Sequence, residues 1–395
     1  MRQEHQVPME EKLFKDFDGV SRDEWQNKII ADLKGKEIGS LNWEAAGLSG
    51  GPIYTKEDLP EQLPNIANVH DQPAIFGARN WVNYQLIDVD SDKTANQQAL
   101  EALNAGADGV IFNLNTKPEL TVLLADIKTD YCHISFTDQL EDSDLPDSFS
   151  GYLVSIQADL SKVKGYYSGS ASVQKASGML PHYQFFNIEA DQYHNNPVQE
   201  LALVLCKAAE VFDKQTGAGI QPKTLLTQTQ FELSLGTSYF TEIAKYRAMR
   251  ALGIRFANAY NINISACDLN VLARTGSWTE AIDDAHSYML RATTEAMAAI
   301  LGGTDALCIQ PFYNVFEKQQ KDLAERSARN ISNVLKEESY FNKVVDPASG
   351  SYFVESLTRE IMNKSWQLFL DMEAAGGYSS LSADKMESLY QNLIA

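Results

Sequence analysis

The sequence has little that would direct the chain to a membrane or out of the cytoplasm. Its first residues, Met1 to Gln6, contain no apolar run that could serve as a signal peptide. The longest apolar runs, such as Leu201 to Cys206, are far too short to span a bilayer. We therefore expect a cytoplasmic protein without a membrane partner.

Cysteine and positive charge are also scarce. The four cysteines are widely spaced and form no C-x-x-C pair, which favours buried reduced thiols over disulfides or a zinc site. There are 33 Lys and Arg against 53 Asp and Glu, so the formal net charge is −20. Because nucleic acid is bound by clustered Lys and Arg, we expect no nucleic-acid partner. A small anionic ligand is still compatible with a few local basic groups.

Self-contained catalytic motifs are absent as well. The sequence contains no P-loop, no G-x-G-x-x-G turn, no H-E-x-x-H and no G-x-S-x-G. No catalytic residue and no metal ligand can therefore be assigned from a short motif.

The chain does contain β-rich runs that alternate with helical patterns, which is typical of a parallel α/β fold. Eight strands are predicted, at residues 82–87, 110–114, 132–136, 152–157, 184–188, 231–235, 263–269 and 306–309. Helices are predicted at residues 96–105, 119–128, 197–214, 238–252, 285–301 and 317–337. Eight strands favour a (β/α)8 TIM barrel, with an open doubly wound sheet as the alternative.

An N-terminal helical arm precedes the predicted barrel. Residues 14–41 include a short amphipathic helix led by Ser21-Arg-Asp-Glu24, a capping-box pattern. We predict the arm over residues 1–50 and the barrel over residues 51–395. Residues 138–149 and 164–178 are rich in Asp, Ser, Gly and Tyr and are expected to be loops.

Several longer segments match one family at the family's spacing. The run from Tyr239 to Arg250 contains E-I-A-K-x-R-A, and it is followed by Leu290 to Asp305 and then by Val345 to Glu355. Upstream, Pro52 to Leu59 and Asn96 to Gly109 match in the same way. Together these segments resemble the substrate barrel of methylmalonyl-CoA mutases of the small (beta) subunit type, over nearly the entire chain. The resemblance does not extend to a cobalamin-binding domain.

The resemblance implies a cobalamin-dependent isomerase that interconverts methylmalonyl-CoA and succinyl-CoA. In that family the barrel threads acyl-CoA along its axis, and a domain with D-x-H-x-x-G supplies a histidine to the cobalt of adenosylcobalamin. This sequence has no D-x-H-x-x-G. Adenosylcobalamin is therefore expected in the family complex and not on this chain alone.

Departures from the sequence of the family's active barrels indicate which subunit of that complex the chain resembles. Active barrels carry Y-H-x-x-E-A-G-A, where this chain has Tyr193-His194 followed by Asn-Asn-Pro, and the T-I-Q-N-D and R-N-T-Y segments are not found. The resemblance thus implies a non-catalytic small subunit that forms a heterodimer with a homologous large catalytic subunit. The alternatives are a competent barrel acting with a separate or truncated cobalamin domain, and a stand-alone acyl-CoA-binding module.

Four residues are candidates for contact with a substrate. Tyr193 and His194 are in the place of the family's active-site pair, although His194 can equally be a loop histidine bonded to backbone. Arg274 follows a predicted strand and so lies at the carboxyl face of the barrel, where it would contact an anion or form a loop salt bridge. Trp278 would line the same mouth or simply pack.

Three basic residues share the segment 238–252. Lys245, Arg247 and Arg250 would form either a phosphate-binding patch or a solvated or subunit-facing helix edge. Glu242 is expected to pair with Lys245 at i,i+3.

Overall fold

A computed structural model describes residues 19–59, 79–140, 143–190, 196–276, 285–312 and 318–394. No helix in these ranges is long and apolar enough to cross a membrane. The chain divides into two compact units, Met1–Asp58 and Leu59–Ala395, and each is considered by itself. The predicted arm over residues 1–50 and barrel over residues 51–395 stay predictions.

The first unit contains the predicted amphipathic segment. Helix α1 (Arg22–Asp32) begins with the expected capping box, in which Glu24 N donates to Ser21 Oγ at 3.2 Å and Ser21 N donates to Glu24 Oε2 at 2.8 Å. The helix is followed by η1 (Ile38–Leu41), the antiparallel strands β1 (Trp43–Ala45) and β2 (Leu48–Gly50), and η2 (Lys56–Asp58). No residue of α1 is buried.

Nine strands of the second unit form one parallel sheet. They are β3 (Val82–Asp88), β4 (Gly109–Leu114), β5 (His133–Asp138), β6 (Gly165–Ser168), β7 (Tyr183–Gln184), β8 (Phe186–Glu189), β9 (Thr229–Leu235), β10 (Asn270–Thr275) and β11 (Ala306–Cys308). Their order is β7-β6-β5-β4-β3-β11-β10-β9-β8. Only Phe185 separates β7 from β8, so these two short strands hold one position and join the two ends of the sheet. The result has eight strand positions, which confirms the (β/α)8 barrel and rules out the open doubly wound sheet.

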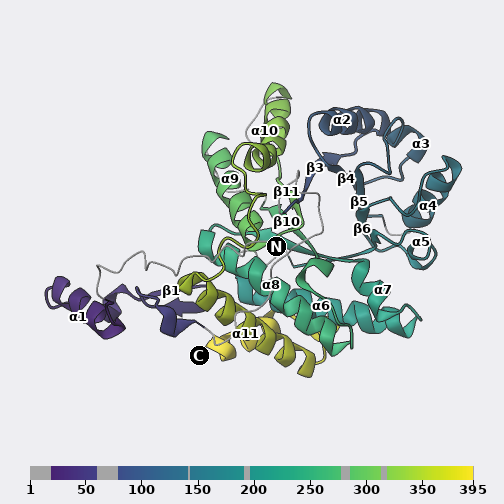
Figure 1. The fold of residues 1–395 in the computed structure, drawn as a ribbon. Coiled ribbons are helices and arrows are strands. Elements are labelled where there is room, and N and C mark those ends of the chain that lie inside the picture. The colour runs from purple at the N-terminus through teal and green to yellow at the C-terminus, as the bar shows by residue number, and fades with distance from the viewer. Residues whose placement is uncertain are drawn as a thin grey trace, which may run out of the picture. The chain divides into compact units, whose positions relative to one another are not determined.

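Helices surround these strands (Figure 1). They are α2 (Asp92–Asn104), α3 (Leu120–Leu123), α4 (Leu145–Ser155), α5 (Gln174–Ser177), α6 (Pro197–Gly217), α7 (Pro222–Thr227), α8 (Tyr239–Ala259), α9 (Ala285–Gly302) and α10 (Lys318–Glu337). After them come α11 (Tyr352–Ala374), η6 (Tyr378–Ser380) and α12 (Ala383–Ile394). The sequence prediction missed α11 and α12. In Figure 1, α11 runs beside α6 and α8.

Two of the eight predicted strands were wrong. Residues 152–157 lie mostly in α4, where Phe149 and Leu153 are buried at helical spacing, so packing overrides the β-propensity of the local sequence. Residues 263–269 form a loop and the turn η5 (Ala266–Asp268), and the strand begins only at Asn270.

Three other expectations need correction. The loop predicted at 164–178 contains β6 and α5, and the loop predicted at 138–149 ends where α4 begins. The helix predicted at 119–128 is a single turn, α3. Strand β6 was missed because only four residues form it, too few for a clear alternating pattern.

Alternation along the strands defines the inside of the barrel. Tyr84 on β3 packs against residues from four other strands, together with partly buried neighbours on its own strand. This cluster comprises Tyr84, Ile111, Tyr166, Leu272, Ala306 and Cys308, with Val82 and Leu86 against it. Since these strands are paired in register around the sheet, such residues meet only on its inner face.

Candidate functional site

The predicted substrate residues were expected at the carboxyl ends of the barrel strands. Tyr193, His194 and Trp278 lie outside the described residues. Arg274 is the candidate that the structure describes, and it lies on β10 itself, one residue before the strand ends. Its role as a substrate contact stays a prediction.

Arg274 points into the barrel and is already paired there. Its Nε forms an ion pair with Glu232 Oε1 on the neighbouring strand β9, and its Nη2 donates to Tyr166 Oη at 3.1 Å. The side chains of Arg274 and Glu232 are 19% and 6% exposed. Although burial favours the neutral form, Glu232 raises the pKa of the guanidinium well above its usual value. Arg274 is therefore a fixed cation whose charge is neutralised by a protein carboxylate.

Two tyrosines lie inside the barrel beside this ion pair. Tyr84 and Tyr166 meet edge to face with ring centroids 5.9 Å apart, and both are almost completely buried. Tyr84 Oη lies 3.3 Å from His133 Nδ1, and Asn187 Nδ2 donates to Glu232 Oε2 at 2.8 Å. The Tyr84–Tyr166 pair and the Arg274–Glu232 ion pair thus lie together inside the barrel, and we call these four residues the axial plug.

The basic residues of α8 do not form a solvated edge, and that expectation was wrong. Lys245 is completely buried and lies 2.8 Å from Glu200 Oε2 and 2.7 Å from Glu242 Oε2. Its ammonium group donates hydrogen bonds to Glu200 Oε2 and to Ser234 O, the latter at 2.6 Å, whereas its contact with Glu242 is an ion pair without a hydrogen bond. Although burial favours the neutral amine, Glu200 and Glu242 raise the pKa of Lys245. The predicted Glu242–Lys245 pair is confirmed, but as part of a buried triad with Glu200.

Arg247 is likewise buried, and it holds the loop that leads into α11. Its Nε and Nη2 donate to the two carboxylate oxygens of Asp346 at 2.9 and 3.0 Å, a bidentate arrangement. Its Nη2 also donates to Glu355 Oε1 at 2.7 Å. The family segment from Val345 to Glu355 therefore serves to anchor the C-terminal helices on the barrel.

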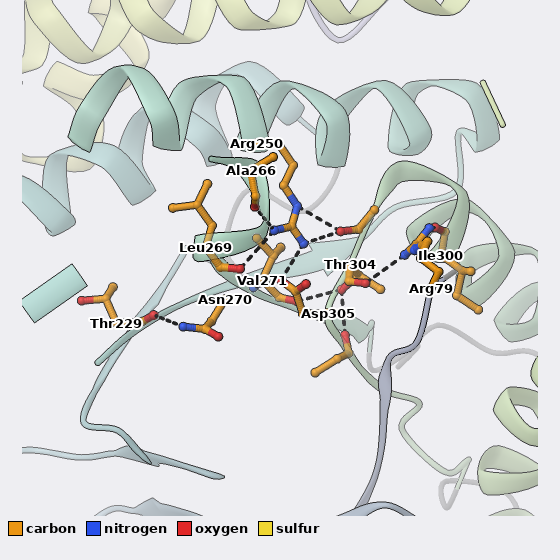
Figure 2. Close-up of polar contacts among 12 residues, drawn as sticks. Arg79, Thr229, Arg250, Ala266, Leu269, Asn270, Val271, Ile300, Thr304 and Asp305 are labelled. Atoms are coloured by element: carbon orange, nitrogen blue, oxygen red, sulfur yellow. Dashed lines mark hydrogen bonds and ion pairs between the residues drawn. The ribbon is translucent and has the colours of Figure 1, made fainter. Parts of the chain in front are cut away.

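Arg250 has a structural role at the amino-terminal end of the strands. Figure 2 shows its guanidinium among backbone carbonyls and beside Asp305, with Arg79 on the other side of Thr304. The acceptors are Ala266 O at 2.7 Å, Leu269 O at 3.0 Å and Gly303 O at 3.0 Å from Nε. These contacts use the donors that a phosphate site would need. A phosphate patch on α8 is therefore not supported.

Two residues of this arrangement were missed in the sequence. Glu200 is a carboxylate among the apolar residues of α6, and Glu232 stands between Phe231 and Leu233 in a strand. A lone charged residue in an apolar run was the available signal, because such a group is stable there only if it is paired. Their partners, Lys245 and Arg274, were not predictable from spacing.

The described residues do not fit cobalamin. The two histidines whose side chains the structure describes, His133 and His182, both lie at the amino-terminal end of the barrel strands. This end is opposite the carboxyl face, where a ligand above the barrel would meet the chain. No step involving cobalamin is therefore assigned to this chain.

Sequence comparisons with known proteins identify the family of the chain. The sequence model of the family described as methylmalonyl-CoA mutase matches residues 162–388. The methylmalonyl-CoA mutase small subunit of Porphyromonas gingivalis is 34% identical over 405 residues, which cover 93% of this chain and 65% of that protein. The small subunit of Propionibacterium freudenreichii subsp. shermanii is 30% identical over 211 residues, covering 52% of this chain and 33% of that protein.

A large subunit is similar over a shorter stretch. The methylmalonyl-CoA mutase large subunit of P. gingivalis is 31% identical over 179 residues, covering 45% of this chain and 25% of that protein. The chain thus spans less than two thirds of the length of each of these relatives. With more than half of its length matched by the family model, the chain belongs to the methylmalonyl-CoA mutase family and resembles its small-subunit type.

Proposed function

We propose that this chain is the barrel of a methylmalonyl-CoA mutase small subunit, that it performs no catalysis itself, and that it pairs with a homologous large catalytic subunit. The assembled enzyme would interconvert methylmalonyl-CoA and succinyl-CoA. The axial plug carries this proposal. Tyr84, Tyr166 and the Arg274–Glu232 pair stand in the path along which active barrels of this family take acyl-CoA.

Opening that path would be energetically costly. Acyl-CoA could pass only if the ion pair separated and both rings left the barrel axis. Separating a buried pair leaves uncompensated charge, at a cost of about 3–5 kcal/mol. Burying two tyrosine rings contributes further stability that displacement would lose. In this proposal the barrel therefore has no pre-formed channel for acyl-CoA.

Adenosylcobalamin, when bound in such an enzyme, supplies the radical chemistry of the rearrangement. In this proposal the partner subunit holds the cofactor, because the described residues of this chain do not fit it. The chain's own contribution is a rigid homologous barrel on which the catalytic subunit is supported. The arm at residues 1–50 is proposed as one element that contacts the partner.

Co-expression with a homologous mutase large subunit tests this proposal. Size-exclusion chromatography with light scattering should give a complex of one chain of each kind, and mutase activity should depend on the large subunit. Tyr166→Phe removes a hydroxyl inside the axial plug while keeping the ring. Turnover of the complex should then stay within about twofold, since no catalytic step uses this group. Loss of turnover in an intact Tyr166→Phe complex, or failure to form any complex, would overturn the proposal.

A further inference from the structure

A cavity of about 300 Å³ opens at the amino-terminal end of the barrel strands, below the axial plug. Side chains from β3, β5, β7, β9, β10 and β11 and from the adjoining turns line it, and Tyr84 is among them. The cavity therefore lies on the barrel axis, at the end opposite the carboxyl face. Its volume is at the lower end of the range for small-molecule sites.

The walls of this cavity carry opposite charges. His133, Lys164 and His182 lie at the beginnings of β5, β6 and β7, whereas Asp268 and Asp305 precede β10 and β11. In the closed sheet β5 is four positions from β10, and β6 is four positions from β11. In a barrel of eight positions, four steps lead to the opposite side. The basic and acidic walls therefore face each other across the mouth.

Only some of these groups are available to a ligand. Asp305 is held by Arg250 at 2.5 Å and accepts from Val271 N at 2.8 Å. Burial lowers the pKa of His133 to about 4, so this imidazole is neutral near pH 7. By contrast, Lys164 Nζ has no hydrogen-bond or ion-pair partner among the described residues.

Asp268 offers one oxygen on the acidic wall. Its Oδ2 accepts from Ser265 N at 2.8 Å and Ser265 Oγ at 2.9 Å, and its Oδ1 has no hydrogen-bond partner in the part of the chain that the structure describes. Lys164 and Asp268 thus contribute one positive and one negative charge on opposite walls. Between them, Val82, Tyr84 and Ala306 offer apolar surface.

We propose that this mouth binds a small zwitterion whose charges lie at the two ends of an apolar chain, as in an ω-amino acid. The carboxylate would face Lys164, the ammonium group would face Asp268, and the methylene chain would lie over the apolar surface. A ligand with several phosphates would meet two carboxylates, Asp268 and Asp305, opposite Lys164, which disfavours it. The site is separate from the proposed subunit pairing and stands or falls independently of it.

The test uses 6-aminohexanoate as the probe, followed by saturation-transfer NMR on the full chain. Hexanoate and hexylammonium are matched controls that each carry one of the two charges. 6-Aminohexanoate should bind saturably and more tightly than either control. Lys164→Met and Asp268→Asn should each weaken its binding by about twofold to fivefold, as expected for exposed ion pairs. Asparagine keeps an acceptor for Ser265, so the turn at η5 should be preserved.

Lys117→Met is the matched control variant. Lys117 is also a surface lysine, but it does not line this cavity, and its ammonium group lies 2.7 Å from Asp144. Its substitution should therefore leave binding unchanged. The proposal would be overturned if 6-aminohexanoate failed to saturate, if hexanoate bound as tightly, or if neither Lys164→Met nor Asp268→Asn weakened binding. Tighter, competitive binding of coenzyme A would identify an anion site instead and would also overturn it.

Discussion

Replacing Lys245 by methionine should destabilise the barrel by about 4 kcal/mol, because it leaves two carboxylates buried without a cation. Lys245 and Glu200 are fully buried, and Glu242 is only 3% exposed. The ammonium group lies 2.8 Å from Glu200 and 2.7 Å from Glu242, so a single substitution removes the cation that both carboxylates share. Methionine fills much of the same volume, which separates the electrostatic loss from the cost of a cavity.

This loss is a large fraction of the stability of a typical protein, which is about 5–15 kcal/mol. Urea denaturation followed by circular dichroism should show a lower midpoint with an unchanged slope. Adding Glu200→Gln to Lys245→Met should recover part of the loss, because a neutral amide needs no cation, and the double-mutant cycle would measure the coupling. A loss below about 1 kcal/mol, the value of an exposed pair, would refute the reasoning.

Three further predictions concern the same unit. Burial raises the pKa of Glu242, so the native state binds the carboxyl proton more tightly than the unfolded chain, and stability should fall as pH rises above about 4.5 through the native pKa. Glu242→Gln should reduce this dependence of stability on pH in urea midpoints measured from about pH 5 to 8, and an unchanged dependence would contradict the prediction. Gly165 has φ +136°, and a β-carbon there would lie 1.9 Å from a backbone oxygen, so Gly165→Ala should lower the unfolding free energy by about 3 kcal/mol. Gly151→Ala is the control, because a β-carbon at Gly151 meets nothing within 4 Å, and it should lower the thermal midpoint little or not at all. Arg247→Lys keeps the charge but loses the bidentate contact with Asp346, and a decrease of about 2 kcal/mol in unfolding free energy is expected, whereas an unchanged value would show that the fork geometry is unimportant.

The barrel could be predicted from the sequence because its strands and helices differ in period. Six of the eight predicted strands were confirmed, and the helices at 197–214 and 238–252 were each found in longer form as α6 and α8. The ends of several helices depend on local chemistry. Asn196 caps α6 by accepting from Gln199 N at 3.1 Å, and Gly106 and Gly303 have φ of 94° and 103°, as expected for glycines that end helices.

The rest depended on contacts between distant residues. Residues 152–157 have the composition of a strand, and only the burial of Phe149 and Leu153 against the barrel makes them helical. The charges of α8 look like a solvated stripe until partners from α6 and the α11 loop are known. Such partners lie 45 and 99 residues away in sequence, beyond the reach of i,i+3 and i,i+4 rules.

The candidate site could be predicted only in part. The sequence placed Arg274 after a strand at residues 263–269, whereas the structure places it on the strand β10 itself. Its pairing with Glu232 could not be predicted, because it depends on the register between β9 and β10 and on a closed barrel. The inward orientation of Tyr84 and Tyr166 could not be predicted either, because either set of alternate side chains of such a strand could face the inside of the barrel.

The central claim, that the axial plug leaves no path for acyl-CoA, is tested most directly by isothermal titration of this chain with methylmalonyl-CoA. A catalytic mutase barrel of the same family, titrated under the same conditions, serves as the positive control. We expect no saturable heat from this chain, because the proposal has Tyr84, Tyr166 and the Arg274–Glu232 pair block the axial path. Saturable binding that Arg274→Ala or His194→Ala weakens would contradict the account and restore a substrate-binding role to this barrel.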